Sequence, residues 1–473
     1  MHTAYESSKS PATNTPIKQR RRTKKRYRTM TLIFIILCVL LYLVFGVSLK
    51  NNWKYKRKHT KATAILATPH VKQLLLREVD TCGINPHFAP LAERLALNSN
   101  NLSAGNAVNI IIDGREKQRM LMDDLRGAKE YIHMEYFHFG MDEGSCSIKH
   151  LLEKKAEEGV KVRFLNENIA NIPIPGAYYR SMRKHGVEVC NFTPYRHNLI
   201  NFLTLLNYRD HRKTVVIDGK VAYTGGMNIN DNYFCRWRDT HMRLTGNAVD
   251  MLQATFLDTW LSSGGKLDKP IDHYFVREKQ PEPVPSTYAF EGKHVQIVPD
   301  DPSSDMRTAQ MAYEWVFDNA QHYVYIQTPY FAPPKHILDA MKGAARRGVD
   351  VVLMLPEKPD HPLLRYTNRA YYEECLEAGI RIVLRGGEFI HSKTFVCDDY
   401  LSQIGTSNMD MRSLELSYEL NTFIYDRETA LSNKQIFLDD LDICHELSLP
   451  TWQERSGWQR AMERLFRCFA PVL

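Results

Sequence analysis

From about residue 106 onward, short runs of apolar and β-branched residues alternate with longer stretches whose apolar positions recur at helical spacing. In the first half this pattern predicts strand 108–112, helix 118–128, strand 131–137, helix 148–158 and strand 161–165. In the second half it predicts helix 307–319, strand 323–327, helix 337–346 and strand 349–355. Strands that alternate with helices of this length form βα units, so we expect two similar α/β domains, each with a mixed, partly parallel sheet flanked by helices.

The segment 30–49 departs from this pattern, because the run from Thr31 to Leu49 has no charged residue and has the length of a bilayer-spanning helix. We predict one N-terminal transmembrane helix there. The alternatives are a buried core helix, which the basic flanks disfavour, and a cleaved signal peptide, which the long basic leader and poor cleavage site disfavour. Because basic residues flank the run on both sides, the positive-inside rule leaves its orientation open.

These patterns divide the chain into six parts. We expect a basic disordered N-terminus (1–29), the transmembrane helix (30–49), a juxtamembrane segment (50–105), a first α/β domain (106–265), a linker (266–295) and a second α/β domain (296–473). The linker is placed by a stretch rich in Pro and Glu at 278–286.

The formal net charge of +8 is concentrated on both sides of the predicted transmembrane helix. Subtracting fourteen basic residues there from +8 leaves −6 for the rest of the chain; they are Lys18, Arg20, Arg21, Arg22, Lys24, Lys25, Arg26, Arg28, Lys50, Lys54, Lys56, Arg57, Lys58 and Lys61. A nucleic-acid enzyme is expected to spread basic residues over its folded domains, so nucleic acid is disfavoured as a partner. The nine cysteines have no metal-type spacing, and we expect no metal and no cofactor.

The most specific feature is a constellation of five residues that occurs twice with identical intervals. The first copy is His211, Lys213, Asp218, Gly225 and Asn228, and the second is His391, Lys393, Asp398, Gly405 and Asn408. Asp239 also lies as far after the first histidine as Glu419 lies after the second. Two copies in register indicate an internal repeat, and a pseudo-twofold relation between the halves would bring equivalent residues into one site.

The residues from each histidine to its aspartate form an apolar, β-branched run that predicts a strand. Side chains alternate along a strand, so His211 and Lys213 project from the same face, whereas Asp218 has the opposite parity and lies at the strand end. The same holds for the second copy. Asp218 and Asp398 therefore read as orienting or turn-fixing residues, although they complete the repeated His-Lys-Asp set.

A phosphodiester is the substrate that suits two histidines, two lysines and two asparagines in one site. One imidazole can attack phosphorus, the other can protonate the departing alkoxide, and the ammonium and amide groups can hold the remaining oxygens without a metal. Asp239 and Glu419 are expected to orient the histidines, because a carboxylate on one ring nitrogen fixes the tautomer. An aspartate on one side and a glutamate on the other would make the two histidines different.

The doubled pattern His-x-Lys-(x4)-Asp-(x6)-Gly-Gly/Ser/Thr-x-Asn resembles the phospholipase D superfamily. The stretches 208–219, 225–228, 237–241, 328–331, 348–350 and 391–394 resemble its bacterial cardiolipin synthase branch. The resemblance implies two phospholipase D-like domains, a bacterial cell membrane location, and condensation of two phosphatidylglycerol molecules into cardiolipin and glycerol through a phosphohistidine. It also implies His211 as nucleophile, His391 as general acid, and Lys213, Asn228, Lys393 and Asn408 as phosphate-binding residues, with Asp218 and Asp398 included in the catalytic motif.

The chain departs from that family in two places. One hydrophobic span is found where many cardiolipin synthases carry two, and Asn166-Glu167-Asn168 stands where the family tends to an Asp and Gly-Ser. A hydrolytic phospholipase D and a phosphodiesterase or nuclease could use the same two histidines. The predicted membrane anchor favours phosphatidylglycerol and membrane lipids as partners, and transfer over hydrolysis, because it holds the site where lipid head groups are concentrated.

Overall fold

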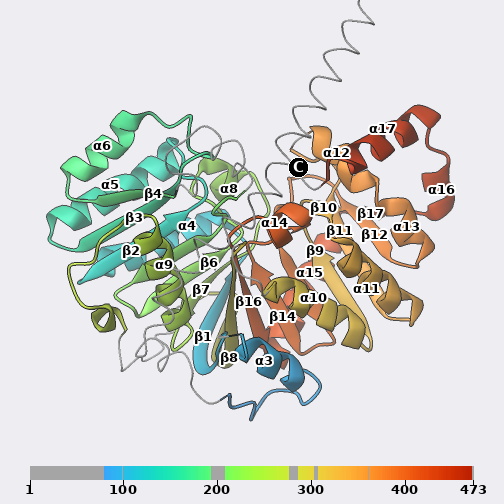
Figure 1. The fold of residues 1–473 in the computed structure, drawn as a ribbon, viewed down its shortest axis with the longest axis horizontal. Helices are drawn as coiled ribbons and strands as arrows, with labels where there is room; N and C mark the ends of the chain where they lie inside the picture. Colours follow the sequence, from blue (N-terminus) through green and yellow to red (C-terminus); the bar gives the residue numbers. More distant parts are fainter. Residues whose placement is uncertain are drawn as a thin grey trace, which may run out of the picture.

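The computed structural model describes residues 79–98, 100–192, 208–275, 286–302, 307–360 and 362–470. They form two α/β halves that lie side by side and meet along the central strands (Figure 1). The predicted basic N-terminus and transmembrane helix lie outside the described residues. Among the helices that the structure describes, none combines the length and apolar character that crossing a bilayer requires.

The first half contains the predicted strands and helices in the predicted order. Its elements are α3 (Ala89–Ala96), β1 (Leu102–Ile111), α4 (Gly114–Gly127), β2 (Tyr131–Tyr136), α5 (Glu143–Glu157), β3 (Lys161–Glu167), α6 (Gly176–Lys184), β4 (Glu188–Phe192), β5 (Lys213–Ile217), β6 (Val221–Gly225), α8 (Asp231–Cys235), β7 (His241–Thr245), α9 (Val249–Ser262) and a 3-10 helix (Ile271–Tyr274). Helices α4 and α5 begin earlier than predicted, because Asp113 and Asp142 cap their first turns by accepting hydrogen bonds from main-chain N–H groups.

The second half confirms its four predicted elements as α10, β9, α11 and β11. Its elements are β8 (Ala289–Asp300), α10 (Thr308–Asn319), β9 (Tyr323–Gln327), β10 (Phe331–Ala332), α11 (Lys335–Arg346), β11 (Asp350–Pro356), α12 (Pro362–Arg369), α13 (Tyr372–Glu377), β12 (Arg381–Arg385), β13 (Thr394–Cys397), β14 (Leu401–Gly405), β15 (Met409–Asp410), α14 (Met411–Glu415), β16 (Glu419–Tyr425), α15 (Arg427–Leu441), β17 (Cys444–Glu446), α16 (Leu449–Gln453) and α17 (Gly457–Arg467).

Both halves contribute to one sheet of fifteen strands within the described part of the chain. From the centre outward the first half runs β1-β7-β6-β5-β2-β3-β4, and the second runs β8-β16-β14-β13-β9-β11-β12, with β17 added at its edge. The outer pairs β2–β3, β3–β4, β9–β11 and β11–β12 are parallel, whereas β1 pairs with β8 antiparallel at the centre. Each half therefore has the mixed, partly parallel sheet that the sequence predicts, and the two sheets are continuous.

Helix α3 lies within the stretch 50–105 that the sequence assigns to a juxtamembrane segment, yet it belongs to the core of the second half. Its buried Leu91 and Leu95 share a hydrophobic cluster with Val298 of β8 and Val316 of α10. Strand β8 likewise begins inside the predicted linker 266–295. Both segments are structured because they bury apolar side chains in the second half, from which α3 is distant in sequence and into which β8 leads directly.

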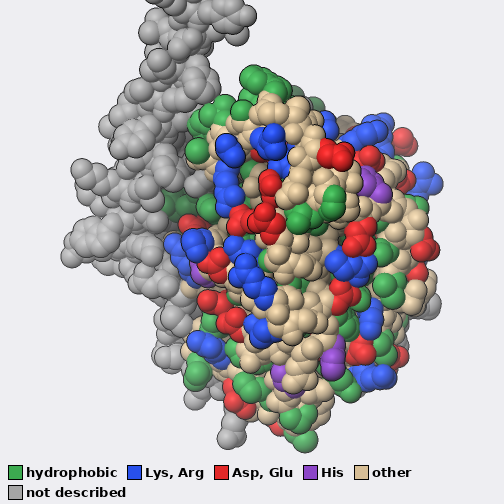
Figure 2. Space-filling model, turned by 90° about the vertical axis from the view of Figure 1, so that its right-hand side faces the viewer, with side chains coloured by type: hydrophobic (Ala, Val, Ile, Leu, Met, Phe, Trp, Pro, Cys, Tyr) green, Lys and Arg blue, Asp and Glu red, His purple; other side chains and the backbone are tan. Residues whose placement is uncertain are grey.

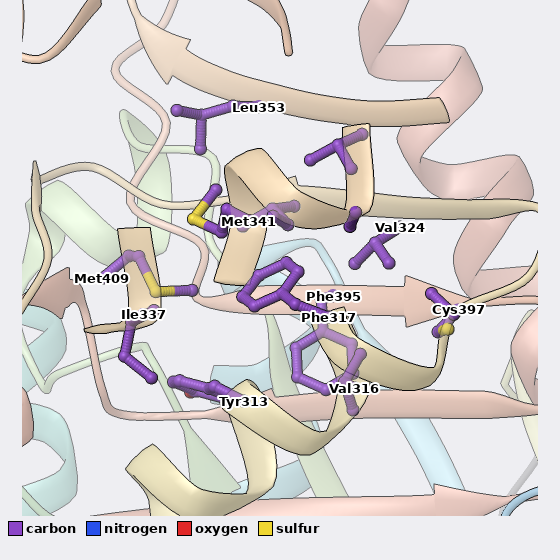
Figure 3. Close-up of a cluster of buried hydrophobic side chains, with 14 of the residues drawn as sticks. Tyr313, Val316, Phe317, Val324, Ile337, Met341, Leu353, Phe395, Cys397 and Met409 are labelled. Atoms are coloured by element: carbon purple, nitrogen blue, oxygen red, sulfur yellow. The ribbon is translucent and has the colours of Figure 1, made fainter. Parts of the chain in front are cut away.

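The core of the second half positions strand β13, which directly follows Lys393. Phe317 of α10, Met341 of α11, Leu353 of β11 and Phe395 of β13 are buried together on one face of the sheet (Figure 3). Close packing of this kind leaves a strand little freedom to shift. The residues that precede β13 are therefore held at a fixed place between the two halves.

Candidate active site

Each histidine of the repeat is held by the main chain of the opposite half. The His211 N–H donates to the Tyr418 carbonyl (2.9 Å), and the His391 N–H donates to the Arg238 carbonyl (2.7 Å). The predicted strands are shorter than expected, since β5 and β13 begin after the histidines. Each histidine instead lies in a short extension that pairs across the interface between the halves.

The carboxylates of the repeat also cross between the halves. His211 Nδ1 lies 3.1 Å from both carboxylate oxygens of Glu419, and His391 Nδ1 lies 2.7 Å from Asp239 Oδ2. Both carboxylates are fully buried. A His–carboxylate pair thus takes one member from each half, so neither half contains a complete pair. In each histidine the carboxylate contacts Nδ1 and not Nε2, and Lys393 Nζ lies 3.1 Å from Nε2 of His391.

The lysines lie beside the histidines and repeat each other's contacts. Lys213 Nζ donates to the His211 carbonyl (2.6 Å), and Lys393 Nζ donates to the His391 carbonyl (2.5 Å). Lys393 Nζ also lies 2.8 Å from His391 Nδ1. Both side chains are almost completely buried, and each places an ammonium group beside the histidine of its own half.

The two asparagines face the space between the histidines but differ in their partners. Asn228 Nδ2 donates to the Tyr233 hydroxyl (2.8 Å), and its Oδ1 accepts from the His138 N–H. Asn408 Oδ1 is buried and has no hydrogen-bond partner among the described residues. The buried Lys117 of α4 supports Asn228 by donating to its main-chain carbonyl (3.2 Å). The sequence does not indicate this contact, because the two residues are distant in the chain.

The two aspartates that the motif includes in the catalytic set do not line the site. Asp218 accepts hydrogen bonds from the N–H groups of three consecutive residues, 129–131, at 2.7–2.9 Å, and Asp398 accepts the same three bonds from residues 321–323. Both have positive φ, +50° and +47°, in the turn after the strand. Their placement among the catalytic residues is corrected: they join the strand end to the start of β2 or β9, as strand parity indicates.

The histidines open onto a pocket of about 400 Å³ between the halves. His211, Asn228, His391 and Asn408 line it together, so the structure brings the repeated residues of both halves into one site. The other lining residues are Phe137, Arg209, Tyr233, Trp237, Tyr330, Asp360, Leu364, Asp410, Arg412, Ser413 and Ser417. Several come from α8 and α14, which lie near the junction of the two halves (Figure 1).

Comparison with known proteins assigns the family. The family described as "Cardiolipin synthase, PLD-like domain" matches residues 121–260 and again 315–441, one match in each half. The chain is 34% identical to cardiolipin synthase 2 of Bacillus anthracis, over 93% of this chain and 85% of that protein. It is 32% identical to the major cardiolipin synthase of Bacillus subtilis (strain 168), over 96% of this chain and 95% of that protein.

The chain belongs to the cardiolipin synthase family of the phospholipase D superfamily. A solved structure, the phosphatidylserine synthase of Haemophilus influenzae Rd KW20, matches with a TM-score of 0.60 at 16% identity, covering 80% of this chain and 97% of that one. At that identity the match supports the fold alone. It agrees with two phospholipase D-like domains that form one large mixed sheet.

Within this family site, the two His–carboxylate pairs differ electrostatically. Burial would raise the pKa of Asp239, but His391 and Lys393 lower it below its usual value, so this carboxylate is ionised near neutrality. Burial raises the pKa of Glu419 to about 7, against the opposing effect of Lys213. The ionised Asp239 therefore stabilises a charged His391 more strongly than Glu419 stabilises a charged His211.

Burial and mutual repulsion disfavour the positively charged forms of the two histidines and the two lysines. Burial, then Lys213 and Lys393, lower the pKa of His211 well below its usual value. Burial and Lys393 lower the pKa of His391 to about 4, with Asp239 opposing. Burial also lowers the pKa of Lys213 to about 7 and of Lys393 to about 8. An anionic ligand would favour the charged forms of all four groups.

Sequence reasoning missed most of the pocket wall, including the arginines at its His211 end. Arg209 makes a bidentate ion pair with the fully buried Glu167 (2.7 Å for both bonds), which lies in the stretch where the chain departs from the family pattern. Arg412 is partly buried and lies near enough to Arg209 for each charge to affect the other. In the sequence, both arginines lie near the repeated motif, but neither has an arginine at the equivalent position of the other copy.

Proposed function

We propose that this protein transfers a phosphatidyl group from one phosphatidylglycerol to another, giving cardiolipin and glycerol, through a phosphohistidine on His211. The observation that carries the proposal is the pair of crossed His–carboxylate contacts that open onto one pocket. The matched strand order of the two halves and the matched contacts of Asp218 and Asp398 support a pseudo-twofold relation between them. The family assignment supports the substrate and product, because the curated relatives are cardiolipin synthases over nearly their full length.

In the first step His211 Nε2 attacks the phosphorus of the donor lipid. The N–P bond forms as the bond from phosphorus to the glycerol oxygen breaks, and His391 Nε2 gives that oxygen its proton. Glu419 holds Nδ1 of the nucleophile, and Asp239 stabilises the charge that His391 carries before the transfer. Negative charge that develops on the phosphoryl oxygens favours the protonated form of His391.

Lys213, Lys393, Asn228 and Asn408 hold the phosphoryl oxygens. The ammonium groups supply charge. The amide of Asn408 lies in the pocket wall, where its Nδ2 can donate to a phosphoryl oxygen, while its Oδ1 has no hydrogen-bond partner among the described residues. Such preorganised donors act most strongly where water is excluded. Together they offset the negative charge of the phosphoryl group during both steps.

The second step distinguishes transfer from hydrolysis. An alcohol of a second phosphatidylglycerol gives its proton to His391 Nε2, its oxygen bonds to phosphorus, and the electron pair of the N–P bond returns to His211. Water in the same position would yield phosphatidic acid. The predicted single-pass anchor at 30–49 favours the lipid alcohol, because it keeps the site at a bacterial membrane surface.

A nuclease that uses the same two histidines is the less favoured function. The outer face of the second half carries Lys and Arg interspersed with Asp and Glu rather than one continuous basic surface (Figure 2). Nucleic-acid enzymes need extended positive surfaces to neutralise phosphates. The net charge of −6 that remains outside the basic N-terminal region also disfavours a nucleic-acid substrate, and so favours a lipid.

Lipid product analysis tests the proposal. Purified protein supplied with phosphatidylglycerol vesicles and no metal or nucleotide should release one glycerol for each cardiolipin formed. His211→Ala and His391→Ala should each abolish turnover. Phosphatidic acid as the only product would make the protein a hydrolase, and retained activity in either variant would contradict a site shared between the halves.

A further inference from the structure

The pocket is symmetric in the repeated residues and asymmetric elsewhere. Positions 22 and 26 residues after each histidine line it in both halves, but they are Tyr233 and Trp237 after the first histidine and Ser413 and Ser417 after the second. Tyr233 and Trp237 both lie against the histidine of the opposite half, His391. The aromatic side chains are therefore concentrated at one end of the pocket.

Three aromatic rings of the pocket wall lie near His391. The ring centroids of Tyr233, Trp237 and Tyr330 lie 5.2, 5.5 and 6.4 Å from that of the imidazole. At the other end of the pocket His211 packs against Phe137 at 4.8 Å, and Arg209 and Arg412 supply positive charge. The two ends thus offer different chemistry to a substrate that spans them.

The aromatic end also contains a carboxylate that no step above uses. Asp360 lines the pocket and accepts the Tyr330 hydroxyl through both of its oxygens, at 2.9 and 2.8 Å. An ionised carboxylate can only accept hydrogen bonds and has about four acceptor positions, so capacity remains beyond the one tyrosine hydroxyl. Its charge disfavours a phosphate at this end and favours a neutral ligand that donates hydroxyl groups.

We propose that Asp360 and Tyr330, with Trp237 as an apolar wall, form a polyol subsite that binds the glycerol head group at the His391 end of the pocket. The inference rests on the proposed function, since in-line attack by His211 leaves both the departing and the entering glycerol beside His391. The C–H groups of glycerol pack against the indole, and its secondary hydroxyl donates to Asp360. Its primary hydroxyl then lies at His391 Nε2.

This subsite gives the phosphohistidine a preference for an alcohol over water. The primary hydroxyl loses its proton to His391, forms the new O–P bond, and releases His211 as the N–P bond breaks. Water has no second hydroxyl for Asp360, and a monohydric alcohol has none either. Asp360 is exposed, so the preference equals the net contribution of a hydrogen bond to a charged group, which an acceptor with a second hydroxyl makes and one without it does not.

Acceptor competition tests the subsite. The full-length protein in detergent is given phosphatidylglycerol labelled in its acyl chains, together with isotope-labelled free glycerol and 1-propanol at equal concentration. The ratio of exchanged phosphatidylglycerol to phosphatidylpropanol is measured, together with cardiolipin for the lipid-linked glycerol and phosphatidic acid for water. We expect the wild type to prefer glycerol by about tenfold or more, and Asp360→Asn to lose about tenfold of that preference.

The variants are chosen so that every result is informative. Tyr330→Phe should lower the same ratio less, and Glu357→Gln, which changes an exposed carboxylate three residues earlier outside the pocket, should leave it unchanged. The ratio compares acceptors for one phosphohistidine, so partial misfolding does not affect it. A wild type without preference, an unchanged ratio in Asp360→Asn, or loss of all products including phosphatidic acid in both pocket variants would overturn the subsite. A wild type that makes only phosphatidic acid would instead overturn the proposed function.

Discussion

Replacing Asp239 by Asn should separate the roles of the two histidines. The change keeps the size of a side chain that is fully buried and removes its charge, 2.7 Å from His391 Nδ1. A hydrogen bond to a charged group contributes about 1.5–3 kcal/mol, and about 1.4 kcal/mol corresponds to a factor of ten in rate. We therefore expect phosphohistidine formation from phosphatidylglycerol to slow by about 10- to 150-fold.

The assay compares two donors in a rapid-quench measurement of phosphohistidine formation. Phosphatidylglycerol loses a glycerol alkoxide that needs a proton from His391, whereas phosphatidyl-p-nitrophenol loses a phenolate that leaves unprotonated. Asp239→Asn should slow the first donor strongly and the second within about threefold of the wild type. The matched change Glu419→Gln alters the support of the nucleophile, so it should slow both donors alike.

Equal losses for both donors in Asp239→Asn would refute His391 as the general acid. A leaving-group effect confined to Glu419→Gln would show that the two histidines exchange roles. Both variants remove a buried charge at the same kind of contact, so a general loss of stability cannot produce opposite patterns. Thermal unfolding of both variants supplies the control for folding.

Three further changes follow from the geometry. Gly226→Ala should reproduce the Asp239→Asn pattern with a loss of about tenfold or more, because an added Cβ would lie 2.1 Å from Asp239 Oδ1; the two-donor assay checks it. Asp218→Asn weakens three hydrogen bonds from main-chain N–H groups, so it should cost about 1–3 kcal/mol in the free energy of unfolding by urea and leave much more activity per folded molecule than His211→Ala. Burial lowers the pKa of Lys213 to about 7 and of Lys393 to about 8, so their ammonium forms are lost as pH rises through this range. Accordingly kcat/KM should fall above about pH 8, and a fall only near pH 10 would contradict phosphate binding by these lysines.

Much of the fold and the repeated site follows from the sequence. Strand 323–327 was placed to the residue, and helices 307–319 and 337–346 to within two residues, because apolar periodicity is a local property. The strand-end position of Asp218 and Asp398 followed from side-chain alternation, which is equally local. The internal repeat identified both histidines, both lysines and both carboxylates, since identical spacing in two copies needs no coordinates.

Only the tertiary structure decided which of these residues meet. Asp239 follows His211 in the chain but contacts His391, and Glu419 follows His391 but contacts His211, because the strand extensions cross at the junction between the halves. The place of α3 in the second core and the gathering of Asp360, Tyr330 and Trp237 in one pocket depend on contacts between distant segments. Sequence periodicity reports which face of an element is buried, whereas the partner it is buried against is set by how the whole chain packs.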